Sequence, residues 1–178
     1  GTVLASKLAI NYGISCNTAG GSHHANYDGG AGYCVFNDVA VAAHYLLNRG
    51  LANKILIVDL DVHQGNGNSE IFKENRSVFT FSMHGERNYP MHKEQSDLDV
   101  DLPDGTDDSS YLRLLDRHLK ELMDRVQPNF VFFQSGVDVL ATDKLGRLAM
   151  TIEGCKQRDR LVLETCKQQR VPLVASTH

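Results

Sequence analysis

Two acids and a histidine alternate at the end of an apolar run, and they are the residues best suited to chemistry. Residues 57–67 read I-V-D-L-D-V-H-Q-G-N-G, so Asp59, Asp61 and His63 occupy every second position. Successive side chains of an extended strand point to opposite faces, which places these three on one face if the chain stays extended. Open parallel sheets bind ligands beyond the carboxyl ends of their strands. The segment therefore predicts a polar, metal-competent cluster at a strand end.

A second acid follows another apolar run. Residues 130–134 read F-V-F-F-Q and lead into S-G-V-D, so Asp138 can reach the same rim of a sheet as Asp61 and His63. Two carboxylate oxygens and one imidazole nitrogen, with a position open for water, suit a catalytic zinc or ferrous ion better than a closed structural site. Each acid alone can instead cap or turn the chain. Taken together, the two acids and the histidine favour a metal site over separate capping roles.

A histidine pair lies in a glycine-bounded loop after a third predicted strand. His23 and His24 belong to G-G-S-H-H-A. Neighbours in an extended chain point apart, so the pair is poorly suited to bind one ion but suited to acid and base catalysis beside it. A surface or core role is the alternative. The two histidines lie at a strand end, in a turn that brings the backbone close to a ligand, and this position favours a catalytic role.

The elements that must position these residues alternate between helix and strand, which predicts an α/β fold with a parallel sheet. Predicted helices cover residues 3–12, 37–48, 69–74, Ser109 or Ser110 to 126, and 153–169. Predicted strands cover residues 14–18, 54–60, 78–83, 130–134 and 171–176. Residues 85–108 form a long irregular excursion, within which Leu98, Val100 and Leu102 are typical of a strand edge.

Composition narrows the class of protein. The 178 residues predict one domain, and a net charge of −4 without a basic cluster argues against direct nucleic-acid contact. Without a membrane-length apolar run or a signal-peptide pattern, we expect a soluble, intracellular, cytoplasmic protein, or a nuclear one in a eukaryote. The four cysteines show no C-x-x-C spacing and are expected to be reduced and buried; this includes Cys16 in a predicted strand and Cys34, a packed thiol rather than a nucleophile.

Four motifs occur in a fixed order: G-G-S-H-H-A, G-A-G-Y-C-V-F-N-D, V-D-L-D-V-H-Q-G-N-G and Q-S-G-V-D. In this order they resemble the zinc-dependent histone deacetylase family of the arginase-deacetylase fold, from about residue 1 to the end of the chain. H-Q-G-N-G, R-N-Y-P at 87–90 and D-K-L-G-R-L at 143–148 resemble the class IV branch and its bacterial relatives. The resemblance implies a three-layer sandwich around a mainly parallel sheet.

The resemblance also implies roles for the residues of the predicted cluster. Zinc ligands would be Asp61, His63 and Asp138, and the acid and base pair would be His23 and His24. Asp59 would accept a hydrogen bond from His23 and orient it. Asn66 would be the partner of His24, where many members of the family carry an acid. A neutral partner makes His24 less inclined to hold a proton and more ready to act as a base.

Substrate and ion contacts follow from the same resemblance. The carbonyl of Gly32 would accept the substrate amide N–H, and Tyr33 and Tyr89 would flank the lysine stem, with ordinary packing as the alternative for Tyr89. The implied cofactors are Zn(2+) and K(+). Potassium would lie beside Asp59, Asp61, His63 and Ser82, with a second position beside Phe72, Asn75 and Val78.

The implied reaction is hydrolysis of an N-acyl-lysine, carrying an acetyl or longer acyl group, on a peptide or protein such as a histone or on a small acylated amine. The family pattern places the start of this chain inside the domain and its end before a G-G-Y whose tyrosine binds the oxyanion. Two alternatives stay open: an arginase-like ureohydrolase with two manganese ions, which neutral Asn66 disfavours, and an acyl-lysine-binding pseudoenzyme without that tyrosine.

Overall fold

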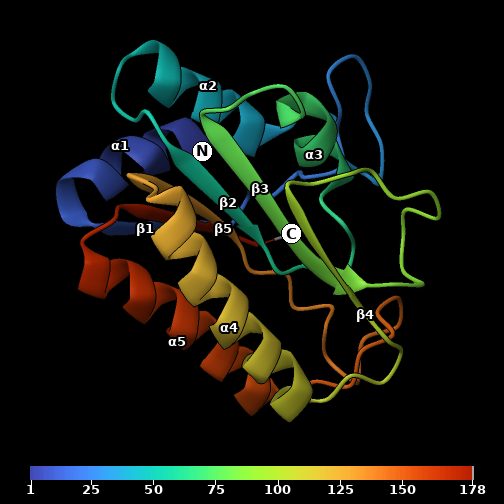
Figure 1. Cartoon of the computed structure of the whole chain (residues 1–178). Helices are drawn as coiled ribbons and strands as arrows, with labels where there is room; N and C mark the ends of the chain where they lie inside the picture. Colours follow the sequence, from blue (N-terminus) through green and yellow to red (C-terminus); the bar gives the residue numbers. More distant parts are fainter. Residues whose placement is uncertain (178) are drawn as a thin grey trace.

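The computed structural model describes residues 1–177 and contains one parallel sheet with helices on both faces (Figure 1). The helices are α1 Thr2–Tyr12, α2 Asp38–Asn48, α3 Asn66–Phe72, α4 Asp108–Val126 and α5 Ile152–Gln169. The strands are β1 Ile14–Asn17, β2 Ile55–Asp59, β3 Val78–Gly85, β4 Leu98–Leu102, β5 Phe130–Gln134 and β6 Leu173–Ser176. Their order is β1-β6-β5-β2-β3-β4, and every neighbouring pair is parallel. The predicted α/β architecture is confirmed.

Alternation along the central strands explains the three layers. Ile55 and Ile57 of β2 pack into a core cluster with side chains of α1 and α2, whereas Leu56 and Val58 pack into a second cluster with α4 and α5. Because neighbouring side chains leave a strand on opposite faces, a strand that is apolar throughout needs cover on both. Figure 1 shows α4 and α5 side by side over one face of the sheet, with α1 and α2 behind it.

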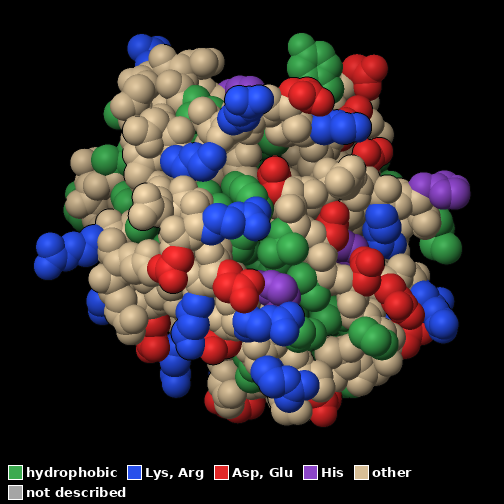
Figure 2. Space-filling view, in the orientation of Figure 1, with side chains coloured by type: hydrophobic (Ala, Val, Ile, Leu, Met, Phe, Trp, Pro, Cys, Tyr) green, Lys and Arg blue, Asp and Glu red, His purple; other side chains and the backbone are tan. Residues whose placement is uncertain are grey.

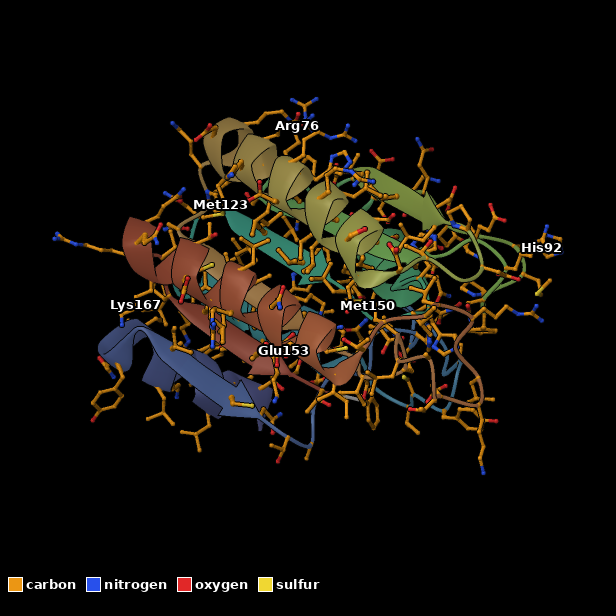
Figure 3. All side chains as sticks on the ribbon, turned by 90° about the horizontal axis from the view of Figure 1, so that it is seen from below. Arg76, His92, Met123, Met150, Glu153 and Lys167 are labelled. Atoms are coloured by element: carbon orange, nitrogen blue, oxygen red, sulfur yellow. The ribbon has the colours of Figure 1, made fainter. Side chains whose placement is uncertain are left out.

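The helix α4 illustrates how local sequence sets an element. Its buried side chains recur at helical spacing: Tyr111, Leu115, Leu119, Leu122, Met123 and Val126. Figure 3 shows this helix beside α5, with Met123 labelled on α4. The predicted cap at Ser109 or Ser110 is wrong. Asp107 caps the helix, because its carboxylate accepts a hydrogen bond from the amide of Ser110, three residues further on.

The helix α3 begins earlier than predicted. The amide of Ser69, where the helix was expected to start, donates instead to the carbonyl of Gly65 at 3.0 Å and closes the first turn. The helix therefore begins at Asn66, which places this side chain at its first turn. Leu98, Val100 and Leu102 do belong to a strand edge: β4 pairs with β3 and ends the sheet.

Cys16 of β1 is exposed, so the prediction that it is buried is wrong. The hydroxyl of neighbouring Ser15 donates to the carbonyl of Ala5 in α1, and the next side chain points to the opposite face of this edge strand. The other three cysteines are buried, as predicted. Burial raises the pKa of the Cys34 thiol, which is consistent with a packed side chain.

The surface over α4 and α5 carries charges of both signs, with Lys and Arg lying among Asp and Glu (Figure 2). Some of these charges pair along the helices, as Lys120 does with Asp116 one turn before it. None of the helices within residues 1–177 is both long enough and apolar enough to cross a membrane.

Candidate active site and metal centre

The chain segments that follow β2 and β5 meet at one rim of the sheet. The two strands end in register, with Asp59 opposite Gln134. Beyond these residues, Asp61, His63 and Asp138 offer ligand atoms that all lie within 4.8 Å of one another. Because β2 ends at Asp59, the loop rather than the strand pleat positions the later two residues of the predicted alternation. The structure nevertheless brings the three predicted ligands together.

Backbone contacts hold the two loops in this arrangement. The amide of His63 donates to Asp61 Oδ1 at 2.9 Å, and the amide of Val62 donates to Asp138 Oδ1 at 3.0 Å. The close approach also needs Gly136, since a Cβ atom at that position would lie 2.8 Å from the Cα of Asp61. The carboxylates are thus fixed by the fold itself.

The donor set fits a divalent zinc ion. Nδ1 of His63 lies 3.0 Å from Asp61 Oδ1 and 2.9 Å from Asp138 Oδ2, so two carboxylates converge on one ring nitrogen. Burial lowers the pKa of His63, but its hydrogen bonds to Asp138 and Asp61 outweigh burial and raise the pKa to about 10. Such a site favours a cation between the acids. Imidazole nitrogen and carboxylate oxygen are both zinc ligands, and three protein ligands leave a fourth position for water, as in catalytic zinc sites.

The histidine pair is anchored from two sides. The carboxylate of Asp38, in the first turn of α2, accepts hydrogen bonds from the amides of Gly21 at 3.0 Å and Ser22 at 2.8 Å. From α3, the amide of Gly67 donates to the carbonyl of His23 at 3.0 Å. A Cβ atom on Gly67 would lie 2.7 Å from that carbonyl oxygen, so the packing of α3 against this loop requires glycine.

The two histidines have opposite protonation preferences. His23 donates from Nδ1 to Asp59 Oδ2 at 2.7 Å; burial lowers its pKa, but the charges of Asp59 and Asp61 outweigh burial and raise it to about 9. For His24, burial and the neighbouring positive charge of His23 lower the pKa to about 3. Their ring centroids are only 4.0 Å apart. A charged histidine therefore lies beside a neutral one.

The partner of His24 determines which ring nitrogen is available as a base. Nδ1 of His24 lies 2.7 Å from Oδ1 of Asn66, and an amide oxygen can only accept a hydrogen bond. Nδ1 therefore carries the hydrogen, and Nε2 is left as the acceptor. His24 also lines the same cavity as His63 and Asp138.

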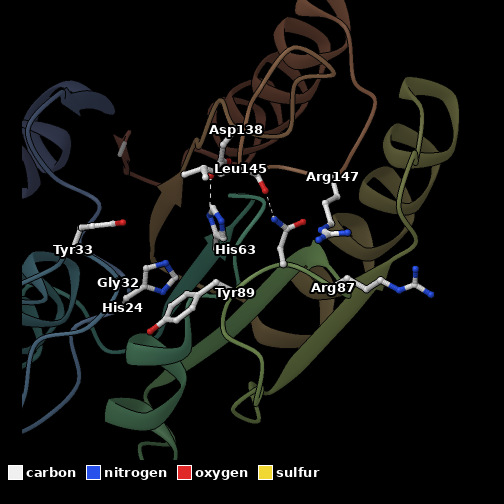
Figure 4. A pocket seen from close by; sticks show the side chains of 10 residues that line it. His24, Gly32, Tyr33, His63, Arg87, Tyr89, Asp138, Leu145 and Arg147 are labelled. Carbon is white, nitrogen blue, oxygen red and sulfur yellow. Dashed lines mark hydrogen bonds and ion pairs between the residues drawn. The ribbon is translucent and has the colours of Figure 1, made fainter.

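The cavity in front of these groups has a volume of about 680 Å³ (Figure 4). Its lining residues are His24, Gly32, Tyr33, His63, Arg87, Asn88, Tyr89, Asp138, Leu145 and Arg147. The ring of Tyr89 meets His24 edge-on at a centroid distance of 4.9 Å. Tyr33 is 97% exposed and has a φ of 65°. All three residues predicted to contact substrate thus line the cavity.

Sequence reasoning assigned no site role to four of the lining residues. Arg87 and Asn88 belong to R-N-Y-P, and Leu145 and Arg147 belong to D-K-L-G-R-L. Both motifs supported only the resemblance to the class IV branch and were given no role in the site. In the structure, Nδ2 of Asn88 donates to the carbonyl of Leu145 at 2.9 Å and joins the two segments. Their presence in these two motifs was the signal that could have identified them.

Comparison with known proteins agrees with this geometry. The family model described as "Histone deacetylase domain" matches residues 1–177. An uncharacterized protein of Picosynechococcus sp. is 51% identical over 97% of this chain and 58% of its own length. Histone deacetylase 2 of Arabidopsis thaliana is 34% identical over 99% of this chain and 46% of its own length.

A third relative, Histone deacetylase B of Dictyostelium discoideum, is 33% identical over 85% of this chain and 38% of its own length. The chain therefore spans about half the length of the curated relatives that it matches. The family match extends over nearly the whole chain and covers all four motifs and every residue of the candidate site. The chain belongs to the histone deacetylase family.

Proposed function

We propose that this chain forms the catalytic centre of a zinc-dependent deacylase that hydrolyses the amide of an N-acyl-lysine. Membership of the histone deacetylase family supports the reaction class. The observation that carries the proposal is that His24, whose pKa is lowered by burial, lines one cavity together with His63 and Asp138 of the candidate metal site. A hydrolase that uses water needs a base and an electrophile at the same place.

Asp61, His63 and Asp138 are the residues that would hold the ion. When bound, zinc supplies Lewis-acid polarisation of the acyl carbonyl and of a water molecule. The three side chains come from two loops that backbone hydrogen bonds already fix, which lowers the cost of assembling the site. Zinc is therefore our proposed cofactor.

The histidine pair would move the protons. Nε2 of His24 accepts a proton from the attacking water, while the hydrogen bond of Nδ1 to Asn66 keeps the ring oriented. The C–N bond of the amide then breaks, and the proton on His24 passes to the departing lysine nitrogen. His23, charged and held by Asp59, lies beside the reacting groups as a fixed positive charge. The products are a carboxylic acid and a free lysine.

The substrate would enter between aromatic side chains. The carbonyl of Gly32 would accept the amide N–H, and the rings of Tyr33 and Tyr89 would flank the apolar lysine stem. Acetyl and longer acyl groups are both substrates to be tested. A place in class IV also stays a prediction. So do the two potassium positions: the one around Asp59 and Ser82, which are register partners on β2 and β3, and the one around Phe72, Asn75 and Val78.

The test uses the chain within its complete natural protein, loaded with zinc. Matched acetyl-lysine and long-chain acyl-lysine peptides are supplied, and release of the free lysine amine is followed with and without a chelator. We expect chelator-sensitive release that falls about 10²- to 10⁴-fold in His24→Ala. His92→Ala, at an exposed histidine outside the cavity lining, is the matched control and should retain activity.

Release from neither peptide, despite one bound zinc, would contradict the deacylase proposal. Two bound manganese ions in the active protein would instead support the ureohydrolase alternative. Peptide binding without turnover would support the binding-only alternative.

A further inference from the structure

A charged side chain occupies the buried face of α5. Arg158 has no solvent exposure, and it lies in the stripe of buried residues that also contains Cys155, Val162 and Cys166. The spacing within this stripe is that of a helix face packed against a sheet. Arginine is rarely buried this fully unless its donors are paired. The contacts of Arg158 therefore need an explanation beyond core packing.

The guanidinium group of Arg158 bonds to both segments that lead to the candidate metal ligands. Nη1 donates to the carbonyl of Leu60 at 3.1 Å and to the carbonyl of Gly136 at 2.6 Å. Nη2 donates to the hydroxyl of Ser135 at 3.0 Å, and Nε donates to Asp159 at 2.9 Å. The planar fork of arginine suits several acceptors held in a fixed arrangement.

These acceptors lie one step beyond the paired strands. The amide of Leu60 donates to the carbonyl of Gln134 at 3.0 Å, just past the point where the register of β2 and β5 ends. Leu60 directly precedes Asp61, and Gly136 stands two residues before Asp138. The guanidinium thus bridges the carbonyls of Leu60 and Gly136 just beyond the paired part of the two strands. The hydrogen bond from the amide of Val62 to Asp138 is a second link between the same two loops.

We propose that Arg158 is a positioning residue that sets the separation of the carboxylates of Asp61 and Asp138, and thereby the affinity of the site for zinc. This inference rests on the proposed function, because it concerns the same metal site. Ligands on two separate loops bind an ion well only if the loops are held at the right distance. Its charge is paired with Asp159 at 2.8 Å, so the bridge acts chiefly through hydrogen bonds.

The neighbouring groups support this role. The hydroxyl of Tyr111, from α4, approaches the same carbonyl of Leu60 at 3.5 Å. The hydroxyl of Ser135 donates to Asp159 at 3.0 Å, so the acid that pairs with Arg158 is itself tied to the segment after β5. Both helices of this layer therefore contact the backbone just beneath the metal loops.

The test compares three variants of the protein. Arg158→Met keeps a long buried side chain but removes all donors, and Arg158→Lys keeps the charge without the fork. Val162→Ala, one turn further along the same buried face, is a control that weakens the docking of α5 without removing a hydrogen bond. Zinc affinity is measured by chelator competition, and the melting temperature is measured on zinc-free protein.

We expect zinc to bind about 10- to 100-fold more weakly to Arg158→Met, with Arg158→Lys between this variant and the wild type. Val162→Ala should lower the melting temperature but change zinc affinity less than about 2-fold, because the two loops keep their bridge. If Arg158→Met does not fold, the zinc affinity of Arg158→Lys is compared with that of Val162→Ala instead.

An arginine variant whose zinc affinity falls no more than that of Val162→Ala, at a comparable loss of melting temperature, would overturn the positioning role alone. Wild-type protein that binds no zinc would overturn the proposed function, and the inference with it. The two failures are therefore distinguishable from the wild-type measurement.

Discussion

Replacing Asn66 with aspartate is expected to raise the pKa of His24 and to change the pH range in which it can act as a base. The amide oxygen of Asn66 lies 2.7 Å from Nδ1 of His24. Aspartate has nearly the same shape, so Asn66→Asp adds one negative charge at this position with little change in packing. The wild-type pKa of His24 is lowered to about 3 by burial and by the charge of His23.

The size of the effect follows from Coulomb's law. Two unit charges about 4 Å apart attract by about 4 kcal/mol at an effective dielectric constant near 20. Since 1.36 kcal/mol corresponds to one pKa unit, this attraction alone would raise the pKa of His24 by about 3. The hydrogen bond to Asn66 already raises this pKa in the wild type, so the carboxylate adds only part of the full attraction, which leaves an expected increase of about 1 to 3.

The sign of the activity change follows from the protonation state. A general base works only when it is neutral, so activity falls when the pH drops below its pKa. A higher pKa in Asn66→Asp means that this loss begins at a higher pH than in the wild type. The acid limb of kcat/KM should move upward by about the same amount as the pKa, about 1 to 3.

Two measurements check this prediction. An NMR titration of the His24 ring in zinc-free protein gives the pKa directly, and the pH dependence of kcat/KM in the zinc-loaded complete protein reports the acid limb. Asn48→Asp, at an exposed position on α2, adds the same charge away from the site and is the control. A pKa of His24 that is equal in Asn66→Asp and the wild type would refute the reasoning.

Three further predictions concern close approaches and exposure. Gly67→Ala should lower kcat at least about 10-fold with little change in zinc affinity, because the new Cβ would displace the carbonyl of His23 and shift the histidine loop; weaker zinc binding with an unchanged kcat would contradict it. Gly136→Ala should instead weaken zinc binding at least about 10-fold in chelator competition, since its Cβ would meet the backbone of Asp61. An unchanged zinc affinity would contradict this prediction and show that the loop adjusts. A thiol reagent should label one cysteine rapidly in folded protein, and Cys16→Ser should abolish this labelling, because the other three are buried.

Much of the fold could be predicted because apolar spacing is a local property. The run at 130–134 and the stripe of α4 each reveal which residues face a core, so strand and helix positions agreed with the structure to within a few residues. Element ends were less predictable. The cap of α4 is Asp107 rather than a serine, because several adjacent side chains could close its first turn. The helix α3 begins at Asn66 after Gly65, which has no side chain that could mark the start. Exposure of Cys16 depends on its strand being at the edge of the sheet.

The candidate site, too, could be predicted from the sequence only in part. Residue types and spacing were enough to nominate Asp61, His63 and Asp138, because two carboxylates and one imidazole after two apolar strands form a donor set that suits a metal, whereas each acid alone could equally cap or turn the chain. The tertiary structure alone decided which nitrogen of His24 is free and which loops Arg158 bridges. These properties depend on partners 42 residues away for His24 and 98 and 22 residues away for Arg158. Burial, charge and distance arise only when such segments pack together, and they set the protonation and geometry that chemistry requires.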